Sequence, residues 1–120
     1  MSVNYGSRRT VVGAHYGLRD WIAQRVTAVI MVVYTVVILS ALAGLPRMDY
    51  WQWLVLWQTP VVQYATVLFM ASLLIHAWIG VRNIFMDYIK DPALRLTLYV
   101  LAIGALLWYG VWAVRLLWSL

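Results

Sequence analysis

His76 is the residue of this sequence whose type and position point most directly to chemistry. It lies in the apolar segment that begins at Pro60, and no other side chain of that segment carries charge near neutral pH before Arg82. A polar side chain at membrane depth costs free energy, so it usually has a partner or a function. An imidazole in such a place can relay protons, form a structural hydrogen bond or act as an axial ligand of haem iron.

The residues spaced around His76 form a polar seam on one side of the helix expected there. Each residue of an α-helix advances by about 100°, so residues four and seven positions apart share a face. The polar seam consists of Ser72, His76, Gly80, Asn83 and Asp87. Its small residues leave room beside the imidazole for a large flat group or for another helix. We therefore expect the polar seam to face protein or a cofactor instead of lipid.

On these grounds three roles stay open for His76. A structural hydrogen bond to a neighbouring helix needs nothing further. A transmembrane proton relay needs a series of ionisable groups, and the outer half of each apolar segment has none, which argues against proton pumping. Haem ligation by two histidines needs a second ligand from a partner chain or a second copy, because the other histidine, His15, lies in the polar N-terminal arm.

Groups near the ends of the apolar segments add two further candidates. Tyr88 can donate a hydrogen bond to a carbonyl oxygen, and Asp87 can orient it, although interfacial tyrosines commonly anchor a helix in the membrane. Asp87 can instead pair with a nearby basic side chain. Arg25 can reach lipid phosphates or an anionic cofactor group such as a haem propionate.

The composition places these residues in a membrane protein. Of the 120 residues, 65% are hydrophobic and only 11% are charged, which is more apolar surface than a soluble domain of this length can bury. The absence of cysteine excludes a disulfide, a thiolate metal site or an iron–sulfur cluster held by this chain alone. The net charge of +5 comes from basic residues that flank the apolar segments, so it indicates contact with membrane lipid and no nucleic acid partner.

Three long apolar segments predict an all-α integral membrane protein. We expect three transmembrane helices at about residues 22–45, 60–88 and 93–117, each able to cross a bilayer core of roughly 30 Å. No internal repeat or linker divides the chain, so residues 1–120 are expected to form one domain with a polar N-terminal arm over residues 1–21.

Short motifs mark the expected helix ends. Thr59-Pro60 and Asp91-Pro92 each place a capping residue before a proline at the first helical position. Tryptophans between the first two segments, on an expected short interfacial helix, and near the end of the third are typical of an aromatic belt. They are Trp51, Trp53, Trp57, Trp108, Trp112 and Trp118.

The basic residues predict the orientation of the chain in the membrane. All but two of the nine Lys and Arg residues lie near the N-terminal arm or the connection after the second segment, the exceptions being Arg47 and Arg115. Basic residues are enriched on the cytoplasmic side of membrane proteins. We therefore expect the N-terminus in the cytoplasm and the C-terminus outside.

Several of these residues together resemble a known family. The stretch His76–Gly80 (HAWIG), followed by Asp87-Tyr88 and Leu94–Leu96 (LRL), is similar to the hydrophobic membrane-anchor D subunit of succinate dehydrogenase, which is respiratory complex II. Gly17–Trp21 (GLRDW) and Arg25–Ala28 (RVTA) resemble the approach of the same family to its first membrane span.

The resemblance implies a role for most of the candidate residues. His76 would be one axial ligand of haem b, with the second ligand supplied by a cytochrome b anchor subunit. Tyr88 would donate a hydrogen bond to ubiquinone, with Asp87 beside it. The implied assembly also contains an iron–sulfur subunit and a flavoprotein subunit, where succinate is oxidised, in a bacterial inner membrane. The family motif gives no role to Arg82, and the chain alone is expected to have no catalytic activity.

Other functions remain as alternatives to a succinate dehydrogenase anchor. An anchor of a fumarate reductase would run the same chemistry in reverse. A small homo-oligomeric transporter would need an intramembrane carboxylate, and none of the four Asp residues falls within the apolar segments proper, residues 26–45, 60–85 and 96–114. A structural adaptor would use His76 for packing only and would bind no haem.

Overall fold

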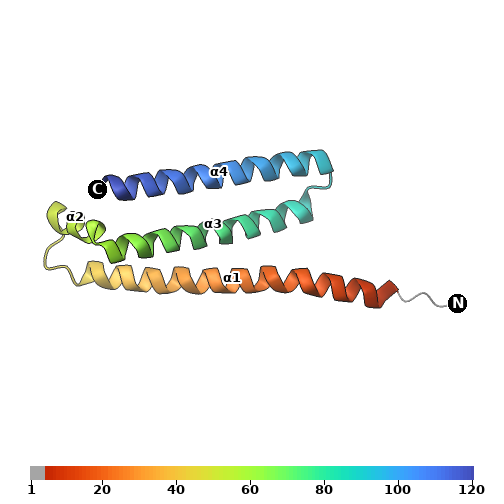
Figure 1. The fold of residues 1–120 in the computed structure, drawn as a ribbon, viewed down its shortest axis with the longest axis horizontal. Coiled ribbons are helices and arrows are strands. Elements are labelled where there is room, and N and C mark those ends of the chain that lie inside the picture. Colours follow the sequence, from red (N-terminus) through yellow and green to blue (C-terminus); the bar gives the residue numbers. More distant parts are fainter. Residues whose placement is uncertain (1–4) are drawn as a thin grey trace.

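The computed structural model describes residues 5–120, with side chains from Gly17 onward, and this part of the chain is helical without strands. Its elements are α1 (Tyr5–Ala43), α2 (Tyr50–Gln58), α3 (Pro60–Tyr88) and α4 (Pro92–Ser119), shown in Figure 1. Three helical stretches are long and apolar enough to cross a membrane: Gly17–Ala43, Pro60–Tyr88 and Pro92–Ser119. The predicted all-α membrane fold is therefore confirmed.

The start of α1 differs from the prediction. We expected the first helix at about residue 22 after a polar arm, but α1 begins at Tyr5, so most of the arm belongs to the helix. Hydropathy marks where a helix enters the apolar part of the bilayer, and it does not mark where the helix begins. The arm contains no proline, and charged residues such as Arg19 are compatible with a helix. Residues 1–4 of the expected arm lie outside the described residues.

The helix ends follow from local capping, with one exception. Asp49 Oδ1 accepts a hydrogen bond from the Gln52 amide at 2.9 Å and caps α2, while Asp91 caps α4 by accepting from the Ala93 amide at 3.2 Å. Thr59 is the N-cap residue of α3 and Pro60 follows it, as predicted, but the Thr59 side chain bonds elsewhere. The Thr59 hydroxyl donates to the Val55 carbonyl at 2.8 Å, at the end of α2, and makes no side-chain cap for α3.

The long helices lie in a row with α3 in the middle (Figure 1). α1 packs on one side of α3 and α4 on the other, while α2 packs near the beginning of α3. The beginning of α1 and the connection between α3 and α4 lie at one end of the row. α2 and the end of α4 lie at the opposite end, so the expected interfacial helix and the late tryptophans of α4 share one end.

Packing between α3 and α4 is close and mainly apolar. Gly110 of α4 lies so near Leu74 of α3 that an added Cβ would be 2.8 Å from the leucine Cδ1. Farther along, Tyr99 of α4 packs edge-on against Trp78, with ring centroids 5.7 Å apart. A residue without a side chain at position 110 thus lets the two helices approach each other.

The row has almost no interior of its own. Among the described residues, Thr27, Ser72, Ile79 and Leu117 are buried, and most large hydrophobic side chains are exposed. In water this surface would drive aggregation, whereas in a bilayer it contacts lipid tails or the helices of another subunit. Two of the four buried residues are polar. Thr27 contacts His76, and Ser72 lies one turn before His76 in α3. Polar contacts therefore contribute to how α1 and α3 fit together.

Candidate functional site

Polar residues of α1 lie along the face that meets α3. Asp20, Gln24, Thr27 and Tyr34 are separated by four, three and seven positions, which places them on one side of the helix. Because α1 and α3 run in opposite directions, early residues of this face meet late residues of α3. The result is a ladder of contacts between the two helices, with His76 near its middle.

His76 is held by Thr27. Its Nδ1 lies 3.1 Å from Thr27 Oγ1, and the threonine is only 6% exposed. The same Thr27 hydroxyl donates to the Ala23 carbonyl at 2.7 Å, one turn earlier in α1. The contact fixes one edge of the imidazole against α1, and it leaves the opposite ring nitrogen, Nε2, with no hydrogen bond among the described residues.

An apolar groove lies beside His76 on the surface of α1 and α3. It has a volume of about 300 Å³ and is open on one side. Its lining consists of Ala28, Met31, Val32, Thr35, Val36 and His76. The imidazole supplies the only nitrogen atoms among the lining side chains, so the groove combines an apolar surround with one nitrogen ligand.

The rest of the polar seam is divided between protein and exterior. Ser72 is 3% exposed, and Gly80 faces α1, since an added Cβ would lie 4.0 Å from Gln24 Nε2. The expectation that the polar seam faces protein is therefore met from Ser72 to Gly80. Asp87 at its end is exposed.

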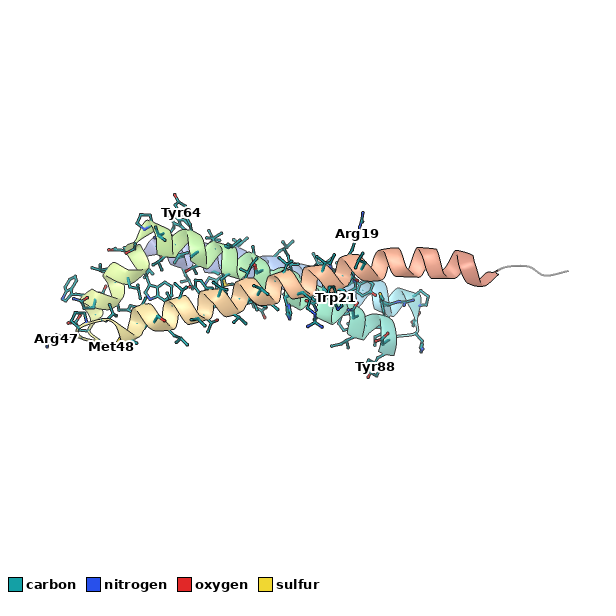
Figure 2. The ribbon with its side chains drawn as sticks, turned by 90° about the horizontal axis from the view of Figure 1, so that it is seen from below. Arg19, Trp21, Arg47, Met48, Tyr64 and Tyr88 are labelled. Carbon is teal, nitrogen blue, oxygen red and sulfur yellow. The ribbon has the colours of Figure 1, made fainter. Side chains whose placement is uncertain are left out.

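Tyr88 and Asp87 lie at the end of α3, and Tyr88 projects from the row (Figure 2). Tyr88 is 78% exposed, and its phenol forms no hydrogen bond within the described chain. His76 and Tyr88 occupy one helix but do not meet. They therefore lie at two separate places on the subunit, His76 beside α1 and Tyr88 at the end of the row.

Arg25 is exposed and lies over an aromatic ring. Its guanidinium carbon is 5.3 Å from the ring centroid of Trp21, one turn earlier in α1. This cation–π contact orients the arginine without burying its charge. The side chain can therefore still reach a phosphate or carboxylate outside the chain.

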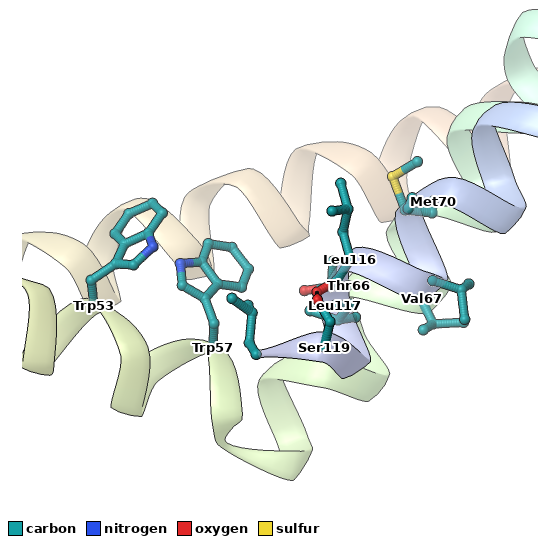
Figure 3. Close-up of a pocket in the computed structure, with 11 residues that line it drawn as sticks. Trp53, Trp57, Thr66, Val67, Met70, Leu116, Leu117 and Ser119 are labelled. Atoms are coloured by element: carbon teal, nitrogen blue, oxygen red, sulfur yellow. Dashed lines mark hydrogen bonds between the residues drawn. The ribbon is translucent and has the colours of Figure 1, made fainter.

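A larger groove, at the opposite end of the row, offers no comparable chemistry (Figure 3). Its volume is about 420 Å³, and its lining includes Trp53 and Trp57 of α2, Met70 of α3 and Leu117 of α4. No residue that lines it is charged or a histidine. We therefore place the candidate site at His76 and Tyr88 and not in this groove.

Comparison with known proteins gives the family of the chain. Residues 4–114 match the family model described as succinate dehydrogenase/fumarate reductase transmembrane subunit. The chain belongs to that family. It is also 38% identical over 102 residues to the succinate dehydrogenase hydrophobic membrane anchor subunit of Coxiella burnetii, a match that covers 85% of this chain and 89% of the relative. The family resemblance drawn from the HAWIG and Asp-Tyr motifs is confirmed.

The family motif gives no role to Arg82, but the structure shows its partner. Arg82 of α3 forms an ion pair with Asp20 of α1, and the two side chains are 29% and 38% exposed. Asp87, the carboxylate nearest to Arg82 in the sequence of α3, takes no part in an ion pair within the described chain. Arg82 therefore joins two helices of the subunit.

Sequence reasoning missed both Thr27 and the partner of Arg82. The signal that could have found them is the spacing of the polar residues of α1, which repeats at four and three positions like the polar seam of α3. Two helices that each carry a polar stripe at membrane depth tend to pair through those stripes, because lipid cannot satisfy polar groups.

Proposed function

We propose that this subunit anchors a succinate dehydrogenase in the membrane and helps to hold haem b and ubiquinone. One observation carries the proposal: in a subunit of this family, a membrane-embedded histidine has one nitrogen bonded to a buried threonine and borders an apolar groove. The proposed partners are a cytochrome b anchor subunit, an iron–sulfur subunit and a flavoprotein subunit.

The residues around His76 fit an axial ligand of haem. A neutral imidazole that ligates iron through one nitrogen usually donates a hydrogen bond from the other, and Thr27 Oγ1 is placed to accept it. The described residues contain no cluster of three or more His, Cys, Asp or Glu side chains that could bind a metal. In the proposed assembly this chain would contribute one ligand, His76, and the cytochrome b anchor subunit would contribute the second.

Haem b supplies a one-electron redox centre when it is bound. His76 would hold the iron, and the apolar residues of the groove would keep water away from it. Arg25 is a candidate partner of a haem propionate because its charge is exposed next to the same helix face. Lipid phosphate is the competing partner of this arginine.

Tyr88 is the proposed contact of ubiquinone. Its exposed phenol can donate a hydrogen bond to a quinone carbonyl oxygen, which stabilises negative charge on that oxygen as electrons arrive. Asp87 beside it would orient the phenol when quinone is bound. Because both residues lie at the end of the row, the iron–sulfur subunit would complete this site from outside the bilayer.

The alternatives differ in how well they agree with the structure. The family includes fumarate reductase subunits, so the family alone does not give the direction of the reaction. We propose succinate oxidation because the relative from Coxiella burnetii is named a succinate dehydrogenase subunit. A transporter is disfavoured by the positions of the carboxylates. Contrary to expectation, Asp20 lies within the membrane-spanning stretch Gly17–Ala43 and Asp87 within Pro60–Tyr88, but both are near the ends of these stretches, and Asp20 is paired with Arg82.

The orientation is proposed from the basic residues. The end of the row with Arg19, Arg25, Arg82, Lys90 and Arg95 would face the cytoplasm, and the end with α2 would face outward. A bacterial relative supports placement in a bacterial inner membrane. Tyr88 would then lie on the same side as the soluble subunits that deliver electrons.

The experiment that tests the function is a reduced-minus-oxidised absorption spectrum of the complex purified through this chain. Wild type, His76→Ala and His15→Ala, the control that removes the other histidine, are compared. We expect a b-type haem band in wild type and in His15→Ala, and its loss or shift in His76→Ala. Succinate oxidation by a soluble dye, measured on the same samples, reports whether the flavoprotein subunit is still attached.

Two results would contradict the proposal. A haem band that is unchanged in His76→Ala would remove His76 as a ligand. A wild-type preparation without a co-purified flavoprotein would remove the anchor function itself.

A further inference from the structure

The hydrogen bonds of Thr27 determine which nitrogen of His76 carries the proton. A threonine hydroxyl has one proton to donate and can accept at its lone pairs. Thr27 Oγ1 lies 2.7 Å from the Ala23 carbonyl and 3.2 Å from the Gln24 carbonyl, two acceptors that can only receive a proton. The hydroxyl proton is therefore committed to the backbone of α1.

With its proton committed, Thr27 Oγ1 can only accept from the imidazole. With this arrangement of the hydroxyl, the Nδ1 of His76, 3.1 Å away, is the nitrogen that we assign the hydrogen to. In a neutral imidazole this leaves the lone pair on Nε2. Thr27 is 6% exposed, so water has little access to replace it as the acceptor.

We propose that Thr27 is a positioning residue for haem: it holds His76 in the tautomer and ring orientation in which Nε2 faces outward as the iron ligand, and it strengthens that ligand by accepting the Nδ1 hydrogen. The inference rests on the proposed haem ligation by His76. An acceptor on the far nitrogen of a ligating histidine increases electron donation by the ring and stabilises the oxidised metal. Removal of the Thr27 hydroxyl should therefore raise the midpoint potential of the haem and weaken its retention.

Thr97 of α4 provides a control for Thr27. Its hydroxyl donates to the Ala93 carbonyl at 2.9 Å, one turn earlier in its helix, which is the same kind of backbone contact that Thr27 makes. It has no side-chain partner among the described residues. Replacement of Thr97 by valine removes this kind of contact without touching His76 or the groove beside it.

The test compares Thr27→Val, Thr27→Ser and Thr97→Val with wild type in the assembled complex. The readouts are the haem midpoint potential, from a spectroscopic redox titration, and the rate at which haem transfers to an apo-globin acceptor. We expect a higher potential and haem loss that is faster by about 10- to 100-fold in Thr27→Val. Thr27→Ser and Thr97→Val should remain close to wild type.

The outcomes separate this inference from the proposed function. If His76→Ala loses haem but Thr27→Val keeps the wild-type potential and haem transfer rate, the role of Thr27 is overturned and haem ligation stands. If the haem band survives His76→Ala, the proposed function fails first. Should Thr27→Val not assemble, Thr27→Ala also lacks the hydroxyl with a smaller side chain, and a wild-type potential in that variant overturns the inference equally.

Discussion

Asp20 of α1 and Arg82 of α3 form an ion pair that joins two membrane-spanning helices close to one end of the row. The buried Gln24 Oε1 and Arg82 Nε beside this region have no hydrogen-bond partner among the described residues. The pair is 38% and 29% exposed, so solvent and headgroups weaken the attraction. The main effect of the ion pair is therefore to fix the register between α1 and α3.

The ion pair should behave as a coupled unit when either charge is removed. We expect Asp20→Asn and Arg82→Gln each to lower the melting temperature of the purified complex, and the double variant to lower it by less than the sum. The coupling energy should be roughly 0.5–1 kcal/mol, as for partly exposed pairs. Lys90→Gln, at an exposed basic residue with no ion pair in the described chain, serves as the control. Strict additivity of the two single changes would show that the pair contributes nothing.

Tyr88→Phe should separate quinone reduction from succinate oxidation. The change removes the phenol hydroxyl and keeps the exposed ring, so the fold should not respond. Loss of one hydrogen bond to the quinone should reduce ubiquinone reduction by about tenfold, while reduction of a soluble dye by succinate stays unchanged. Tyr64→Phe, an equally exposed tyrosine in the other half of α3, is the control. Unchanged ubiquinone kinetics in Tyr88→Phe would place the quinone elsewhere.

Tyr34 and Thr66 repeat the arrangement of His76 and Thr27 with the helices exchanged. Thr66 Oγ1 donates to the Val62 carbonyl at 2.7 Å, so the Tyr34 hydroxyl, 2.7 Å away, is the donor between helices. Tyr34→Phe should cost about 0.6 kcal/mol, the average for such bonds in membranes, and lower the melting temperature slightly.

Tyr34→Ala should cost more than Tyr34→Phe, because it also removes the ring stacked on Phe69 at a centroid distance of 4.5 Å. Equal melting temperatures for the two variants would show that stacking has no part in the pairing of α1 with α3.

Gly110 and Gly104 should differ in their tolerance of a large side chain. Leucine at position 110 must displace Leu74, since an added Cβ already lies 2.8 Å from its Cδ1, and we expect a destabilisation of about 1–3 kcal/mol. Gly104 has nothing within 4 Å of an added Cβ, so Gly104→Leu should be neutral for packing within this chain. Melting temperatures of the two variants in the complex provide the measurement, and equal values would contradict the close approach of α3 and α4.

The absence of cysteine allows a direct test of orientation. Single cysteines at Arg47 and at Lys90 lie in connections at opposite ends of the row. In intact cells a membrane-impermeant maleimide should label Arg47→Cys, and Lys90→Cys should react only after the membrane is opened. The reverse pattern would invert the proposed topology and place Tyr88 outside.

The sequence predicts those helix ends that are defined by local residues. Pro60 begins α3 and Asp91-Pro92 begins α4, and both signals were legible before the structure. The start of α1 could not be predicted from the sequence, because the arm has no proline to stop a helix and its charged residues are compatible with one. The Thr27–His76 and Asp20–Arg82 contacts join residues 49 and 62 positions apart, so they depend on how two helices align. The polar stripes predict that the two helices pair, but they do not predict which residues meet.

The order of the helices has a consequence for how the subunit enters the membrane. Chains fold from the N-terminus during synthesis, so α1 occupies the bilayer before α3 has been made. The Thr27 hydroxyl crosses at little cost, because the backbone of its own helix already satisfies its proton. When α3 follows, its imidazole and its guanidinium arrive beside an acceptor and a counter-charge that are in place. We therefore expect α1 to present the partners of His76 and Arg82 before α3 inserts.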